Sequence, residues 1–362
     1  MGVAELRART RTRALALRTR VPAALRTERA LRSAAAASVL ANVLIVVTGG
    51  AVRLTASGLG CPTWPSCTAA SLVPTSQTAG HGIIEFTNRA LTGVLVAVAA
   101  ATLVIAVLQR RERVLAALAF AGIPAQAVLG GVTVLTHLNP WVVACHFLLS
   151  MAILALTATL WWRLAQTRRS GPATPAQAPA PAQAPVLASA PVLASAWLVT
   201  TATAVVLVVG TVVTGSGPHA GATNSSGKVR RTGLDPRGVS QLHADVVMVL
   251  VGLTIGLVLL LLAVSADRGL RRAAAVLLAA ELAQATIGFV QYFTKLPVVL
   301  VGFHLLGACL VWLGVLNVLL RVVSPPAKLA SEQLRDDIDG EADERAHDGA
   351  VHPDELKISA HL

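Results

Sequence analysis

The sequence predicts an all-α integral membrane protein with eight transmembrane helices, arranged as two parallel-repeat four-helix bundles. Hydrophobic residues make up 54% of the 362-residue chain, the mean hydropathy is +0.67, and only 13% of residues are charged. A soluble domain carries roughly 25% charged residues. Apolar runs of about 20 residues, the length that crosses a bilayer as a helix, recur along the chain. The excess of Ala, Val and Leu over aromatic residues argues against a transmembrane β-barrel.

Eight apolar runs of this length follow one another, with polar or basic segments between them. They cover 34–54, 82–108, 114–136, 141–163, 195–214, 241–264, 271–294 and 297–322. The net charge of +12 comes mostly from arginines flanking the runs, as at 109–113, 163–170 and 267–272, so it does not indicate a nucleic-acid partner. Positive charge beside a span marks the cytoplasmic side. We therefore expect a multi-pass protein in the lipid of the plasma membrane, with both termini in the cytoplasm.

Composition divides the chain into five segments. We expect a basic cytoplasmic N-terminal segment at 1–33, an N-terminal four-helix half at 34–163, a Pro/Ala cytoplasmic linker at 164–194, a C-terminal four-helix half at 195–322 and an acidic, disordered cytoplasmic tail at 323–362. The first segment is too long and too charged for an ordinary signal peptide. The Pro/Ala composition of the linker is typical of a spacer. The acidic composition of the tail is typical of a solvated, disordered segment.

An internal repeat relates the two halves. QAVLGGVTVLTHL (126–138) and QATIGFVQYFTKL (284–296) are identical at six of thirteen positions without a gap. The same offset of 158 residues places His146 on His304. Because both halves begin on the cytoplasmic side, we interpret them as parallel repeats related by an axis along the membrane normal.

Single histidines lie at similar depth in three of the even-numbered spans: His146, His243 and His304. Neutral imidazole binds iron, and two histidines on facing helices can supply both axial ligands of a haem. His243 and His304 form such a pair in the C-terminal half. His146 has no matching histidine in the N-terminal half, because the residue 158 positions before His243 is Glu85.

The stretch HGIIEFTNRALTG (81–93) opens the second span with charged residues, although each charge at the bilayer centre costs about 2.5–3.5 kcal/mol on insertion scales. His81, Glu85 and Asn88 are spaced i, i+4, i+7 and share one helical face, which we expect to line a polar cavity opposite His146. Two interpretations of Glu85 remain open. It is a catalytic proton donor or acceptor, or it forms a buried ion pair with Arg89 and has no catalytic part.

Two loops on the expected outer side carry further signals. Cys61 and Cys67 lie in GLGCPTWPSC, where a disulfide can form outside the cell and either brace the loop or act in redox chemistry. The loop 215–240 contains Lys228 and three arginines, against the positive-inside rule. That charge is either a solvated run or a surface for an anionic partner.

The combination of these features resembles the haem A synthase family. The resemblance covers most of 34–322 and rests on the two four-helix halves, the C-x5-C loop, IIEFTNR and the single histidines. It implies that His243 and His304 bind haem b, that the N-terminal half binds haem O on His146 and oxidises it, and that Glu85 is required. It also implies a Cys61–Cys67 disulfide. A ring methyl of the substrate haem O would become the formyl group of haem A, which serves cytochrome c oxidase; haem O synthase is then a natural partner.

Two departures from the family pattern affect the site. The family's span-two pattern is Glu-x-x-His, whereas this chain has Asn88 in that place. Either the substrate haem is five-coordinate on His146, or His81 approaches as a second ligand; we favour the first, because oxygen chemistry needs an open iron position. The loop 215–240 also lacks the second cysteine pair of many relatives, and its basic residues suit haem propionates.

Two other functions compete with this interpretation. A bis-His haem b electron-transfer cytochrome is expected to show two histidine pairs in one bundle, and only one complete pair is present. A haem-binding transporter with parallel repeats is expected to have spans broken by Gly or Pro, and Pro124 is the only clear case.

Overall fold

The computed structural model describes residues 22–75, 79–166, 189–222 and 229–323. Within these ranges the chain is helical, apart from one isolated β-bridge between Ser57 and Ala222. The expectations for the acidic tail, for most of the linker and for most of the basic N-terminal segment concern residues outside these ranges.

Eight long helices follow a short 3-10 helix, η1 (Ala23–Arg26). They are α2 (Glu28–Leu54), α3 (Ala79–Gln109), α4 (Arg113–Leu135), α5 (Pro140–Gln166), α6 (Ala190–Ser216), α7 (Pro236–Ala263), α8 (Arg268–Phe293) and α9 (Val298–Val323). All eight are long and apolar enough to cross a membrane. The prediction of an all-α, multi-pass membrane protein is therefore confirmed. Each helix includes its expected apolar run almost entirely and extends up to a few residues beyond it.

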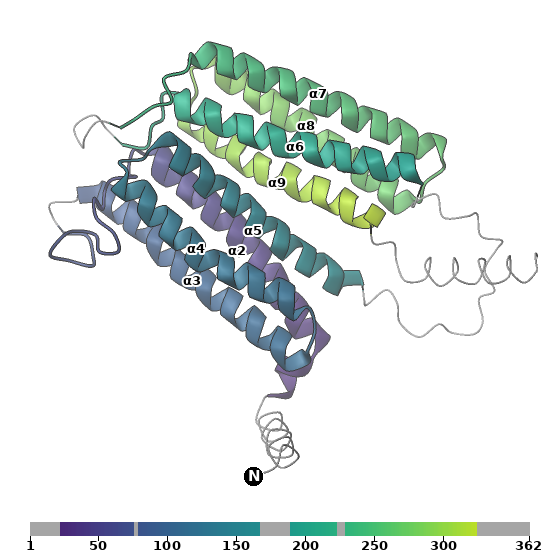
Figure 1. The fold of residues 1–362 in the computed structure, drawn as a ribbon, viewed down its shortest axis with the longest axis horizontal. Coiled ribbons are helices and arrows are strands. Elements are labelled where there is room, and N and C mark those ends of the chain that lie inside the picture. Colours follow the sequence, from purple (N-terminus) through teal and green to yellow (C-terminus); the bar gives the residue numbers. More distant parts are fainter. Residues whose placement is uncertain (1–21, 76–78, 167–188, 223–228, 324–362) are drawn as a thin grey trace, which may run out of the picture.

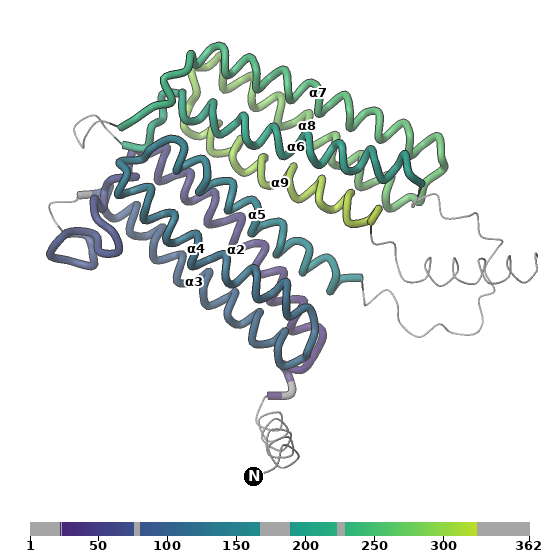
Figure 2. Tube along the Cα trace, in the orientation of Figure 1, coloured from purple at the N-terminus to yellow at the C-terminus, as the bar shows by residue number. Residues whose placement is uncertain are grey.

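The helices form two groups of four that lie side by side, α2–α5 and α6–α9 (Figures 1 and 2). Helix α9 packs against α2, α5 and α6, so it joins the two groups. Buried Val46, Leu154, Leu207 and Cys309 fill this boundary, and the indole N–H of Trp312 donates to a backbone carbonyl of α5 (2.9 Å). The division of the chain into two functional halves and their origin as a parallel repeat stay predictions.

The α4–α5 and α8–α9 connections have the same local conformation. Residues 137–138 and 295–296 all have positive φ, between 52° and 63°, in the left-handed region that non-glycine residues seldom adopt. In each turn the second residue donates its N–H to the carbonyl five residues earlier, at 2.8 and 2.7 Å. These positions are 158 residues apart, the offset of the sequence repeat.

The loops that follow α2 and α6 meet at one end of the molecule, which we call the disulfide end because it carries Cys61 and Cys67. The N–H of Gly58 donates to the carbonyl of Gly221 (2.7 Å). Arg53, in the last turn of α2, donates to the carbonyls of Thr214 and His219, both at 2.8 Å. The two halves are thus tied together by the backbone of their loops.

Candidate functional site

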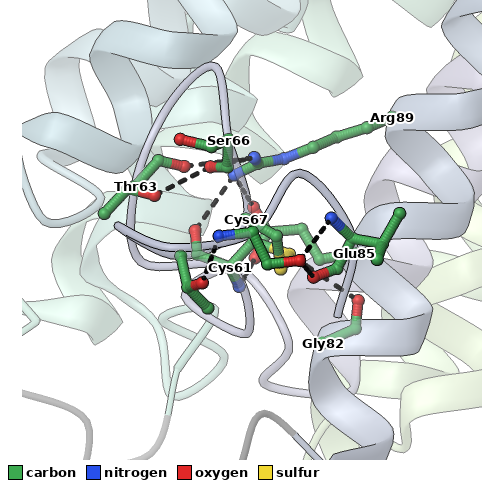
Figure 3. The surroundings of a disulfide bond; sticks show 10 residues. Cys61, Thr63, Ser66, Cys67, Gly82, Glu85 and Arg89 are labelled. Atoms are coloured by element: carbon green, nitrogen blue, oxygen red, sulfur yellow. Dashed lines mark hydrogen bonds and ion pairs between the residues drawn. A yellow bond between two sulfur atoms is a disulfide. The ribbon is translucent and has the colours of Figure 1, made fainter. Parts of the chain in front are cut away.

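A disulfide joins Cys61 to Cys67 in the loop between α2 and α3, as the sequence predicts. Both sulfur-bearing side chains are fully buried, and the loop folds back over the start of α3 (Figure 3). The ring of Trp64 covers Gly131 of α4, where an added Cβ would lie only 2.4 Å from the ring. Any redox role of the disulfide stays a prediction.

Glu85 lies under this loop and is only 5% exposed. One carboxylate oxygen, Oε2, accepts a hydrogen bond from the backbone N–H of Cys61 (2.8 Å). The other oxygen, Oε1, accepts one from the guanidinium of Arg89 at 2.6 Å (Figure 3). The ion pair of the second interpretation is thus present, but it does not decide between the two, and the catalytic role of Glu85 stays a prediction.

Arg89 reaches past Glu85 into the disulfide loop. Its guanidinium donates to the backbone carbonyls of Cys61 (3.0 Å), Thr63 (3.1 Å) and Ser66 (3.3 Å) (Figure 3). Several donors in a fixed fork allow one arginine to hold several carbonyls at once. The pair therefore fastens the loop to α3, a function that the i, i+4 spacing alone does not reveal.

His81 and Asn88 have separate partners. The ring Nδ1 of exposed His81 lies 2.9 Å from the hydroxyl of Ser57, at the disulfide end. The side-chain oxygen of Asn88 accepts a hydrogen bond from Thr48 of α2 (2.8 Å). Within the described residues no hydrogen bond joins either side chain to His146. Their part in a substrate-haem pocket stays a prediction.

The three intramembrane histidines share one environment. Each ring is half-buried, and no ring nitrogen has a hydrogen-bond partner in the described residues; the Nδ1 atoms are buried. Each ring also lies against a glycine of a neighbouring helix, where an added Cβ would touch it. The contacts pair His146 with Gly130 (3.0 Å), His243 with Gly210 (3.2 Å) and His304 with Gly288 (3.3 Å).

Glutamine side chains support two of these histidines in the same way. Gln126 donates to the carbonyl of His146 (2.7 Å), and Gln284 donates to the carbonyl of His304 (2.5 Å). Both glutamines begin the repeated stretch of sequence, which is the signal that could have identified them. Gln126 also donates to Ser150 (2.6 Å), whose counterpart in the other half is Ala308.

His243 and His304 lie on α7 and α9, two helices of the same half that both pack against α6 and α8. Imidazoles without a hydrogen-bond partner at Nδ1 in the described residues leave ring nitrogens available as ligands, which fits a bis-histidine haem site. No cluster of three His, Cys, Asp or Glu side chains suited to a metal ion occurs in the part of the chain described here. Whether His146 or His81 together with His146 would bind the substrate haem stays a prediction.

The basic loop 215–240 is only partly described, and Lys228 lies outside the described residues. Arg231 donates to the carbonyl of Pro218 (2.9 Å), and Thr232 pairs with Ser216 (2.5 Å). His219 is half-buried and bonds to the carbonyl of Leu296 (2.9 Å). The contact of this loop with haem propionates stays a prediction.

One buried carboxyl group is missing from the sequence-based list of site residues. Glu281, near the middle of α8, is 3% exposed and accepts a hydrogen bond from Thr254 of α7 (3.0 Å). Its second oxygen, Oε2, is buried and has no partner in the described residues. A single acidic residue inside an apolar span was the available signal, because such residues mark functional sites in membranes.

The disulfide leads to a first testable prediction. In protein denatured without reductant, an alkylating reagent should modify two thiols, Cys145 and Cys309, and after reduction it should modify all four cysteines. Four modified thiols before reduction would contradict the bridge. Closing this short loop stabilises it by about 2 kcal/mol in the chain-entropy model. The Cys61→Ser/Cys67→Ser variant should therefore unfold at a lower temperature, whereas Cys145→Ser, the matched control, should not.

Comparison with known proteins shows the family of this chain. The sequence model of the cytochrome oxidase assembly protein family matches residues 32–316. Curated relatives named heme A synthase include those of Exiguobacterium sibiricum (33% identical over 141 residues) and Lysinibacillus sphaericus (34% over 140). Each alignment covers 36% of this chain and 47% or 44% of the relative, respectively, so the chain spans less than half the length of these relatives. The match over residues 32–316 includes all eight membrane helices in whole or large part, and the chain belongs to the cytochrome oxidase assembly protein family.

Proposed function

We propose that this protein is a haem A synthase, which oxidises a methyl group of haem O to the formyl group of haem A. The observation that carries the proposal is the His243–His304 pair on α7 and α9 of one half, whose Nδ1 atoms are buried without a hydrogen-bond partner in the described residues. The names of the curated relatives support the same activity. In this proposal the C-terminal half (195–322) binds haem b, and the N-terminal half (34–163) binds the substrate.

The chemistry requires a redox group. A methyl C–H bond does not yield to acid–base catalysis by side chains alone, so a cofactor must perform the difficult step. Haem b, when bound, supplies one-electron transfer. His243 and His304 would hold it, and the hydrogen bond from Gln284 to the backbone carbonyl of His304 would fix the position of that ligand.

His146 is the proposed ligand of the substrate haem. Gln126 holds its backbone as Gln284 holds that of His304. The proposal gives the substrate iron one histidine ligand and leaves its other side available for reaction. Asn88 and His81 are proposed to border this pocket, Asn88 from the α2 side and His81 from its mouth.

Glu85 is the proposed proton-transfer group of the N-terminal half. It accepts hydrogen bonds at both oxygens from Cys61 and Arg89, and this holds the carboxylate in one orientation. Oxidation of a methyl group to a formyl group breaks C–H bonds, and a carboxylate at the disulfide end can donate or accept protons as this happens. Arg89 keeps the loop closed over the carboxylate and excludes bulk water.

The place of the protein in the cell follows from the same proposal. Haem O synthase would supply the substrate, and cytochrome c oxidase would receive the product. We propose the plasma membrane as its location, with the disulfide end outside, because a disulfide persists in an oxidising compartment. Both termini then lie in the cytoplasm.

Extraction of pigment from the purified protein tests the proposal. Haem b together with haem O or haem A is the expected result. Haem b alone would instead identify an electron-transfer cytochrome, and the absence of any haem would favour a transporter; either outcome contradicts the proposed synthase.

A further inference from the structure

Glu281 has no part in the chemistry proposed above, although its burial demands a reason. It lies near the middle of α8, among eight helices that cross the membrane. Burying an ionised carboxylate is costly unless positive charge lies near it, so the protonation of such a group should follow the charge of its surroundings. The structure pairs it with one hydroxyl, that of Thr254, and with no cation in the described residues.

Along α8, the other charged and titratable residues lie far from Glu281. Helix α8 packs against α7 and α9. Those helices and α8 itself carry Arg237, His243, Asp245, His304, Cys309, Arg321, Arg268, Arg271, Arg272 and Tyr292. The nearest on α8 is Arg272, nine residues away, or about 13 Å of helix. Cys309 packs into the boundary between the halves.

A column of polar groups leads from Glu281 towards the disulfide end. Gln284, Gly288 and Gln291 follow at i+3, i+7 and i+10, so all four residues share one face of α8. The side-chain oxygens of Gln284 and Gln291 are buried and, within the described residues, have no hydrogen-bond partner. Gly288 touches the ring of His304, so the column passes the proposed haem b site.

On the other side of Glu281 the bundle is sealed by apolar residues. Leu257, Leu277 and Val315 are at most 1% exposed and belong to the main hydrophobic cluster of the C-terminal half. A proton cannot pass readily through such a core. Glu281 is therefore reachable from the histidine side of the bundle and closed from the other.

The N-terminal half lacks this arrangement. In the repeat, with its offset of 158 residues, Ile123 is equivalent to Glu281 and Thr133 is equivalent to Gln291. Ile123 is 2% exposed and apolar, and the Thr133 hydroxyl is satisfied by the carbonyl of Gly130 (2.6 Å). The buried carboxyl with its polar column is thus a property of the half that we assign to haem b.

We propose that Glu281 is the proton acceptor that balances charge when the His243–His304 site gains an electron. This inference rests on the proposed haem b site but does not require that haem A be made. One electron enters from a one-electron donor and converts ferric to ferrous iron. One proton from water at the disulfide end passes along the α8 column and binds Oε2 of Glu281. Both leave again on reoxidation, so the buried site keeps its net charge.

The test is a redox titration of bound haem b, with dithionite as reductant, repeated across a range of pH. In the wild type the ferrous-to-ferric ratio at a fixed potential should fall with rising pH, by up to about tenfold per pH unit, the limit for one proton per electron. Glu281→Gln should remove most of this dependence. Glu85→Gln, which removes the buried carboxyl of the other half, should retain it. A wild-type ratio independent of pH, or an equal slope in Glu281→Gln, overturns the inference.

Infrared difference spectra of the reduced and oxidised protein give a second readout. Reduction should produce the C=O band of a protonated carboxyl group, and Thr254→Val should shift that band because it removes the hydrogen-bond donor to Glu281. This measurement decides the question even if Glu281→Gln does not accumulate. A band unaffected by Thr254→Val contradicts the assignment. Protein that binds haem b but shows no such band overturns this inference alone, whereas protein without haem overturns the proposed function as well.

Discussion

Replacing either His243 or His304 with alanine should abolish the low-spin spectrum of haem b. Each imidazole would supply one of two axial bonds, so the loss of one leaves the iron without a bis-histidine environment. Neither ring has another hydrogen-bond partner in the described residues that would explain its burial. Absorption spectra of the purified variants, scaled to protein, measure the effect.

A surface histidine provides the control for this prediction. His137 is exposed and has a positive φ of 52°, so asparagine, which tolerates that backbone conformation, is the suitable replacement. His137→Asn should leave the haem b spectrum unchanged. Full-strength, unshifted spectra in both His243→Ala and His304→Ala would show that the pair does not bind the haem.

Glu85→Ala should eliminate the conversion of haem O to haem A while haem b stays bound. The carboxylate belongs to the N-terminal half, whereas the proposed haem b ligands lie on α7 and α9. The quantity to measure is haem A formed per haem b bound. Near-normal haem A production in Glu85→Ala would refute a catalytic role.

Two further variants separate catalysis by Glu85 from its structural contact. Breaking a buried ion pair costs about 3–5 kcal/mol, and the three carbonyls held by Arg89 should lessen that cost. Glu85→Gln can still accept the hydrogen bond from Cys61, but it cannot take up a proton as a carboxylate does. An inactive Glu85→Gln with normal haem b supports proton transfer. Recovery of activity and yield in Glu85→Ala/Arg89→Ala would instead show that the carboxylate only balances charge.

Much of the fold follows from the sequence because a bilayer restricts the choices. A spanning segment must satisfy its backbone internally, so a long apolar run becomes a helix. The run at 34–54 nevertheless becomes α2 (Glu28–Leu54), which starts six residues earlier, at the helix cap provided by Thr27. Hydrophobicity locates the buried part of a helix, and the capping residue decides where the helix begins.

The candidate site was predictable where spacing along one helix determines contact. The pair of Glu85 and Arg89 is an example, because residues four apart are neighbours on a helix. Residues on one helical face point to the same side of the helix, but they can lie at different depths in the membrane. His81 and Asn88 lie about 10 Å apart along α3. They consequently meet different partners, Ser57 and Thr48.

Contacts between distant segments were beyond the sequence argument. The carbonyls that Arg89 holds, and the hydrogen bond from Gly58 to Gly221, depend on how the loops fold at the disulfide end. No periodicity in the sequence encodes such pairings. Glu281 differs, because a lone carboxyl in an apolar span is visible in the sequence; what the structure adds is its unpartnered oxygen and the polar column beside it.

The most direct test of the proposed activity is haem analysis of a host that makes no haem A of its own, expressing this chain together with a haem O synthase. The proposed function predicts that haem A appears only when both proteins are present. It also predicts that haem O accumulates when the haem O synthase is expressed without this chain. Unchanged haem O and no haem A, in cells whose membranes contain the folded chain with haem b bound, would contradict it.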